Sequence, residues 1–156
     1  MYDILVYLFE NYYTPQACPR AEILASKLAA VGFEHEDIDD ALKWLRGLAS
    51  TTERCLPLAI QRDDAQPHAA RIYTDEEYAI LGTEAIGFIS FLEHSDSLPP
   101  ALREILIEAA QAADHFPLSL AEIKVLALMV LWSQEAEVDH LVFEELLTDD
   151  EGRLSH

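Results

Sequence analysis

The sequence predicts a mainly α-helical protein with a winged-helix-like N-terminal half, containing a helix-turn-helix and a short β-hairpin, followed by a C-terminal helical bundle. Two observations predict this class. Apolar residues recur at helical spacing in most segments, and two short apolar runs around a polar loop resemble paired strands. We expect two domains, residues 1–73 and 74–156, without a Gly- or Ser-rich linker between them.

The first half begins with three segments of helical periodicity. Residues 4–13 are apolar on nearly every face and precede Pro15, which suits a buried helix. A second helix is expected over residues 20–31, with Gly32 as a Schellman-type stop. A third helix, over residues 36–49, follows after only a few residues. The last two helices form a helix-turn-helix pattern.

The strand-like runs follow this third helix. Cys55–Ile60 and Ala69–Tyr73 could pair as a β-hairpin around the polar loop 61–68 and complete a winged helix. Pro57 makes this hairpin the weakest element, because proline is confined to a strand start or an edge strand.

Helix signals dominate from Thr74 onwards. Thr74–Glu77 matches a capping box, and Gly82 can close the short helix that it starts. Thr83 begins a second helix that ends near His94, and Pro99-Pro100 opens a third.

The most apolar segment lies near the C-terminus. Pro117 breaks the chain, and Ser119–Glu122 forms a second capping box before the run 123–132. We expect this helix at the centre of the C-terminal core. A last amphipathic segment is expected over residues 139–147.

Charge excludes several classes of function. The chain holds 29 acidic and 10 basic residues, for a net charge of −19. Such a field repels phosphate backbones and anionic lipid, so neither direct nucleic-acid binding nor membrane attachment is expected. The charge is uneven, because residues 71–156 carry −14 and residues 1–70 carry −5.

Two places are candidates for partner binding. Between Glu135 and Glu151, eight acidic residues and no basic one alternate with apolar side chains, a pattern that could dock on a basic, apolar groove. Trp44 lies off the apolar stripe of its helix and could be an exposed anchor, although packing against the hairpin is the alternative. Solubility alone could also explain the acidic segment. The candidate residues are Trp44, Leu141, Phe143, Glu144 and Glu145.

No catalytic, cofactor or metal site is predicted. Cys18 and Cys55 form no close pair, and the six histidines include no HxxxH or HExxH pair. Nucleophile motifs of the GxSxG type and phosphate loops of the GxxxxGK type are absent. The N-terminus lacks the basic region of a signal peptide, and the apolar run 118–132 is too short to span a membrane. We therefore expect a cytoplasmic, non-enzymatic protein.

Several strings along the chain resemble the Smg family of small bacterial proteins. They include the opening Met1–Tyr12 (MYDILVYLFENY), Arg71–Glu77 (RIYTDEE) and Leu126–Trp132 (LALMVLW). The resemblance covers nearly the whole chain. It implies no established biochemical activity and no catalytic residues to carry over, but family members often lie near genes for DNA processing and topoisomerase.

These observations favour an acidic interaction module that binds a basic cytoplasmic protein, for example one of the DNA-processing or transcription machinery. The alternative is a nucleic-acid-binding regulator that uses the helix-turn-helix through Lys43 and Arg46. The sequence leaves the oligomeric state open.

Overall fold

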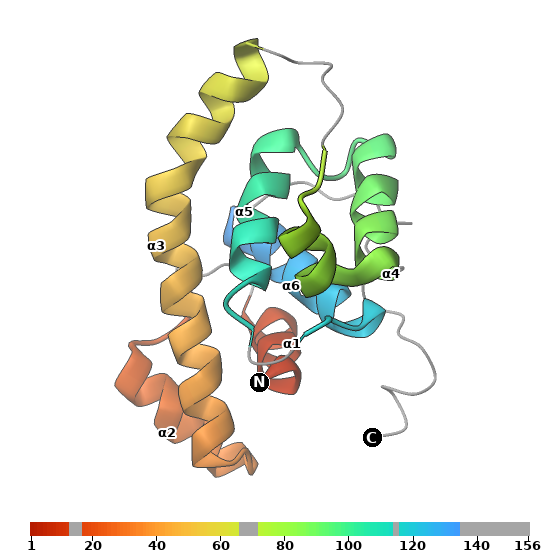
Figure 1. Cartoon of the computed structure of the whole chain (residues 1–156). Coiled ribbons are helices and arrows are strands. Elements are labelled where there is room, and N and C mark those ends of the chain that lie inside the picture. The colour runs from red at the N-terminus through yellow and green to blue at the C-terminus, as the bar shows by residue number, and fades with distance from the viewer. Residues whose placement is uncertain (13–16, 66–71, 114–115, 135–156) are drawn as a thin grey trace.

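The computed structural model describes residues 1–12, 17–65, 72–113 and 116–134, and these residues form helices and no strand (Figure 1). The mainly helical class predicted from the sequence is confirmed. The helices are α1 (Tyr2–Asn11), α2 (Ala21–Val31), α3 (His35–Ala65), α4 (Asp75–His94), α5 (Pro100–Ala110) and α6 (Leu120–Ser133).

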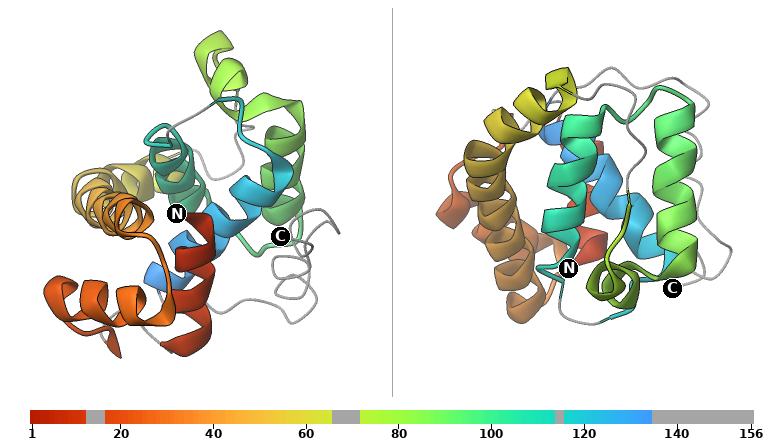
Figure 2. Two further views of the ribbon diagram at one scale, coloured as in Figure 1. Left: turned by 90° about the horizontal axis from the view of Figure 1, so that it is seen from below. Right: turned by 45° about the horizontal axis from the view of Figure 1, so that its top comes forward.

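The helices pack around α6 and along the long helix α3. Helix α6 contacts α1, α4 and α5, and Figure 2 (left) shows it running past α1 towards α4. Helix α3 lies along one edge of the molecule, where its most extensive contact is with α5 (Figure 1). Helices α1 and α2 also pack on α3.

Helix α6 is buried on all sides because nearly every residue in it is apolar. Its start is fixed by a capping box, in which Ser119 Oγ accepts from the backbone N–H of Glu122 and the Glu122 carboxylate accepts from the N–H of Ser119. All residues from Ile123 to Trp132 are buried. A helix that is apolar all round belongs in the interior, so the expected central position is confirmed.

The turn between α2 and α3 follows the predicted Schellman geometry. Gly32 has a φ of +117°, a left-handed conformation that costs a glycine little. The backbone N–H groups of Gly32 and Phe33 both donate to the carbonyl oxygen of Leu28, at 3.3 and 3.2 Å. The Phe33 ring then packs edge-on against Tyr7, with 5.6 Å between ring centroids, and joins this corner to α1.

The predicted start and break of α4 are also confirmed. Thr74 Oγ1 accepts from the N–H of Glu77, and the Glu77 carboxylate accepts from the N–H of Thr74, each at 3.1 Å. Gly82 interrupts the helix with φ +81° and ψ 164°, a conformation that is essentially restricted to glycine. Helix α4 is therefore two helical segments joined at a kink.

The predicted β-hairpin is wrong, and the winged-helix interpretation is not supported. Cys55–Ile60 is helical, because α3 continues without interruption to Ala65 and includes Pro57. Cys55 and Leu56 pack against the hydrophobic core in helical register, while Pro57 is exposed. Burial along the interface with α5 offsets the helix-breaking tendency of one proline. In the second run, residues 69–71 lie outside the described residues, and Ile72 and Tyr73 form no strand.

One hydrophobic cluster joins the two halves of the chain. It contains Leu5 and Trp44 from the first half together with Ile105 and Leu128 from the second. Contacts of α3 with α5 and of α1 with α6 cross the expected boundary. The division into domains 1–73 and 74–156 stays a prediction.

Candidate functional site

Trp44 is buried, not exposed as one reading of the sequence expected. Its side chain is 5% accessible and faces α5, not a hairpin. The indole N–H donates a hydrogen bond of 3.1 Å to the carbonyl oxygen of Ala109. Because Ala109 is in the last turn of α5, where helix carbonyls lack partners within the helix, this bond also caps α5. Trp44 therefore has a place in the core, and we do not propose it as a partner anchor.

The remaining candidate residues of the acidic segment, Leu141, Phe143, Glu144 and Glu145, lie outside the described residues. The last amphipathic helix expected over residues 139–147 lies outside them as well. Their role in partner binding stays a prediction.

The described part of the second half presents an acidic surface. Its two Lys and Arg residues, Arg103 and Lys124, are largely covered: the Arg103 side chain is 12% exposed and Lys124 is 5% exposed. The exposed carboxylates on the same part of the chain are Asp75, Glu76, Glu84, Asp96 and Glu108. The exposed charges of residues 72–113 and 116–134 are thus carboxylates, although the sequence of these ranges also contains two basic residues.

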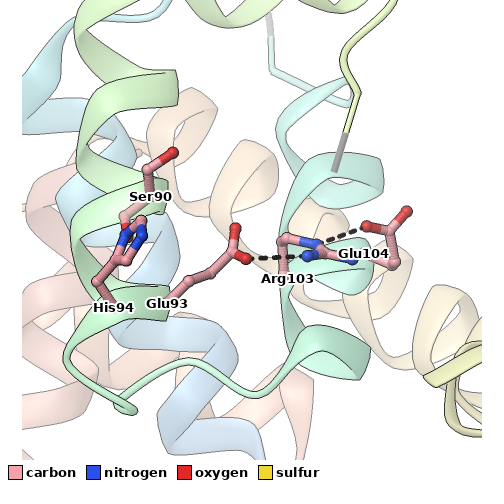
Figure 3. A network of polar contacts seen from close by, with 5 residues as sticks. All are labelled: Ser90, Glu93, His94, Arg103 and Glu104. Carbon is pink, nitrogen blue, oxygen red and sulfur yellow. Dashed lines mark hydrogen bonds and ion pairs between the residues drawn. The ribbon is translucent and has the colours of Figure 1, made fainter. Parts of the chain in front are cut away.

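Arg103 is held by two carboxylates that come from different helices (Figure 3). Its Nη1 donates to Glu93 of α4 at 2.9 Å, and its Nε donates to Glu104 of α5 at 2.8 Å. Burial of the guanidinium opposes its charge, but the hydrogen bonds to Glu104 and Glu93 outweigh this effect and raise the pKa of Arg103. One covered cation thus pairs with two carboxylates and fastens α4 to α5.

Lys124 is covered in a different environment. It lies on α6, and its ammonium group is 5.7 Å from the centroid of the Phe88 ring on α4, within the range of a cation–π interaction. This placement keeps the Lys124 ammonium group inside the helix packing and away from the exposed surface.

The helix that would read DNA in a helix-turn-helix also exposes acidic groups. Glu36 and Asp39 are exposed near the start of α3, and Lys43 and Arg46 are exposed one and two turns later. Asp39 lies 3.3 Å from His35 on the same face. Carboxylates at the leading end of a recognition helix oppose contact with phosphates and bases.

A pocket of about 390 Å³ opens between the segment before α2, the middle of α3 and the end of α6. This size falls within the range of about 300–1,000 Å³ typical of ligand pockets. We call it the α2–α3–α6 pocket. Its walls are mostly apolar, and its lining residues are Cys18, Leu24, Leu45, Leu48, Ala49, Thr52, Glu53, Trp132, Ser133 and Gln134.

Three of the polar groups that line this pocket are hydrogen-bonded within the protein. Thr52 Oγ1 donates to the carbonyl oxygen of Leu48 at 2.8 Å, and Ser133 Oγ donates to that of Val130 at 2.8 Å. The Trp132 indole N–H donates to the carbonyl oxygen of Tyr12 at 3.2 Å. Cys18 is a half-buried free thiol whose pKa is raised by burial. The pocket therefore offers an apolar surface and few donors to a ligand.

Two absences hold for the described residues. No group of three or more His, Cys, Asp or Glu side chains in the described ranges is placed to hold a metal ion. No helix in the same part of the chain has both the length and the apolar character needed to cross a membrane.

The α2–α3–α6 pocket was not anticipated from the sequence. Its lining residues come from three stretches separated by up to more than a hundred positions, and no local pattern connects them. One signal in the sequence indicated the wall that α3 contributes to the pocket. Leu45, Leu48 and Thr52 lie on one helical face, and Thr52 extends this face beyond Ala49, where the predicted helix ended.

The comparisons with known proteins identify a family. A family model described as "Protein of unknown function (DUF494)" matches residues 1–156. The protein named "Protein Smg homolog" from Bordetella petrii is 66% identical over the full length of both chains. Its namesakes from Bordetella avium and Methylibium petroleiphilum are 64% and 46% identical, again over the full length of both chains. No solved structure matches this chain. The chain therefore belongs to the Smg family of proteins of unknown function, also named DUF494.

Proposed function

We propose that this protein is a non-enzymatic interaction module of the bacterial cytoplasm that binds a basic protein. The observation that carries the proposal is the one-sided charge of the surface around α4–α6, where the described residues expose carboxylates while Arg103 and Lys124 are covered. A surface of one sign attracts partners of the opposite sign and rejects others of its own sign.

The amount of charge supports a binding role for this surface. A net charge of −19 on 156 residues is well above the magnitude of about 2–8 that keeps a small domain in solution. Maintaining so large an excess costs stability through self-repulsion. A partner that neutralises part of the charge would offset that cost.

The alternative, a helix-turn-helix regulator that binds nucleic acid, has weaker support. Helices α2 and α3 are joined by a short turn that contains Gly32, and this is the feature that supports the alternative. However, the exposed carboxylates at the start of α3 and the total charge both oppose a phosphate backbone. We therefore propose that the partner is a protein and not the nucleic acid. The gene neighbourhood of the Smg family favours a protein of the DNA-processing or transcription machinery.

The proposal is tested by capture on the immobilised protein from nuclease-treated cytosol of its own host, at low and at high salt. A basic protein that is retained at low salt and released at high salt is the expected result. Retention of nucleic acid in an untreated sample, with no basic protein retained after nuclease treatment, would favour the helix-turn-helix alternative.

Matched variants show whether the acidic surface of the second half is responsible. Three charges are removed there by Glu76→Gln, Glu84→Gln and Glu108→Gln, and three are removed in the first half by Glu22→Gln, Glu34→Gln and Glu36→Gln. All six side chains are exposed, so both variants should fold. The first set should weaken capture and the second should not. Equal loss in both would leave only the net charge as the cause and would contradict a specific acidic surface.

A further inference from the structure

The α2–α3–α6 pocket has the chemistry of a receptor for apolar side chains. Leu24, Leu45, Leu48 and Trp132 supply its walls. Its polar members Thr52 and Ser133 already donate within their own helices, so a polar ligand would find few open donors. A ligand that enters this pocket is therefore held through buried apolar area.

The charge around the pocket selects among apolar ligands. Glu53 is the charged residue among its lining residues, and its side chain is exposed. No Lys or Arg contributes to the lining, and the whole chain carries −19. A second copy of this chain or an anionic amphiphile would be repelled, whereas a ligand with cationic groups beside its apolar part would be attracted.

We propose that the α2–α3–α6 pocket is the docking groove for the apolar face of a basic amphipathic helix on the partner protein. The apolar side chains of that helix enter between α3 and the end of α6, and its Lys or Arg residues face Glu53. This mode of recognition is the laying of an amphipathic helix into an apolar groove. The inference rests on the proposed function, because it gives the basic partner, which is attracted to the acidic surface around α4–α6, an apolar anchor site at the end of α6.

Cys18 provides a direct probe of this groove, since its thiol lines the pocket and is half-buried. The full chain with Cys55→Ser retains Cys18 as its single cysteine. Alkylation of Cys18 by N-ethylmaleimide is followed in the presence of three synthetic amphipathic peptides. The Leu/Lys peptide carries Leu on one helical face and Lys on the other. The Ser/Lys peptide has Ser in place of Leu, and the Leu/Glu peptide has Glu in place of Lys. The Leu/Lys peptide should slow alkylation about tenfold or more by excluding the reagent from the thiol.

The two control peptides separate the two parts of the proposal. Ser/Lys has the charge without the apolar face, and Leu/Glu has the apolar face without the positive charge, so neither should protect Cys18. Equal protection by Ser/Lys would show that charge alone suffices and would overturn the groove. Protection that increases with protein concentration in the absence of peptide would assign the pocket to a second copy and would also overturn the proposal.

Matched variants test the groove without removing core residues. Ala49 lines the pocket and is exposed, so Ala49→Trp should fill the groove and leave the fold intact. Ser50 is exposed on the same helix but does not line the pocket, so Ser50→Trp is the control. Ala49→Trp should weaken Leu/Lys binding about tenfold or more, as expected when a packed pocket is lost. Equal affinity in both variants would contradict the proposal.

The outcomes distinguish this inference from the proposed function. If a basic protein is captured equally by the Ala49→Trp and Ser50→Trp variants, the proposed function is supported and the docking groove is contradicted. If Leu/Lys peptide protects Cys18 but no basic protein is captured from cytosol, the groove stands and the proposed partner class fails.

Discussion

The indole N–H of Trp44 donates a hydrogen bond to the carbonyl oxygen of Ala109, 65 residues further along the chain. Trp132 makes a similar bond to the carbonyl oxygen of Tyr12, the residue that ends α1, at 3.2 Å. Both tryptophans thus join helices from the two halves of the chain through a carbonyl at a helix C-terminus. The two bonds fasten α3 to α5 and α6 to α1, the contacts on which the shared core depends.

Replacing Trp44 should destabilise the whole fold. Trp44→Phe keeps most of the ring but loses the hydrogen bond, and should lower the free energy of unfolding by about 1–2 kcal/mol. Trp44→Ala also opens a cavity between α3 and α5 and should cost about 3–5 kcal/mol. Urea unfolding followed by far-ultraviolet circular dichroism measures both. An unchanged midpoint for Trp44→Phe would show that the hydrogen bond contributes nothing.

Pro57 gives a second prediction, because α3 continues through it. Proline has no N–H and is less favourable than alanine inside a helix by about 3 kcal/mol in host systems. Pro57 is exposed, so Pro57→Ala should restore a backbone hydrogen bond without removing core contacts. We expect an increase of about 1–3 kcal/mol in the free energy of unfolding.

Pro100 is the control for this substitution. It is the first residue of α5, where the missing N–H has no partner within the helix and proline is well tolerated. Pro100→Ala should therefore change stability little. Destabilisation by Pro57→Ala would mean that the proline is required in α3 for a reason other than helix continuity.

Signals that act over a few residues correctly predicted where α2 ends and where α4 and α6 begin, but not that α3 continues to Ala65. The capping boxes at Thr74 and Ser119 and the left-handed Gly32 all have their expected geometry. Each involves neighbours that the sequence itself places together, so no tertiary knowledge is needed.

Features that depend on distant residues were not predicted. The helical state of Cys55–Ile60 depends on packing of α3 against α5, and the burial of Trp44 depends on the same interface. The α2–α3–α6 pocket joins Cys18, Leu48 and Trp132 from three separate segments. Local propensity contains no information on which faces meet, so the candidate site required the fold.

Two glycines should respond in opposite directions to the same substitution. Gly47 lies within α3, and a methyl group added there would meet no atom within 4 Å, so Gly47→Ala should stabilise the protein by about 0.5–1 kcal/mol. Gly82 has φ +81° and ψ 164° at the kink in α4, and Gly82→Ala should cost about 1–3 kcal/mol. Thermal unfolding of the two variants measures both effects. A stabilised Gly82→Ala variant would show that the kink is not required.

Arg103 should contribute to stability through its two carboxylate partners. Arg103→Met leaves Glu93 and Glu104 partly buried without their cation and should cost about 1.5–3 kcal/mol. Adding Glu93→Gln to this variant should recover part of the loss, because one of the two facing charges is removed. Arg54→Met, at an exposed arginine, is the control and should leave the melting temperature nearly unchanged. No recovery in the double variant would contradict the network.

Cys18 should make stability depend on alkaline pH. Burial raises the pKa of its thiol in the folded protein, so the unfolded chain releases this proton at a lower pH than the folded one. Above the unfolded pKa, the unfolded state binds fewer protons, and the free energy of unfolding falls as pH rises. The contribution is complete below the unfolded pKa, about 8.5, and is lost as pH rises through the folded pKa. In the Cys55→Ser protein, the alkylation rate of Cys18 should reach half its maximum above that pH. Replacing Cys18 by serine should remove the contribution of this thiol to the pH dependence of the free energy of unfolding. A midpoint at or below that of a free thiol would place Cys18 in water and not at the wall of the α2–α3–α6 pocket.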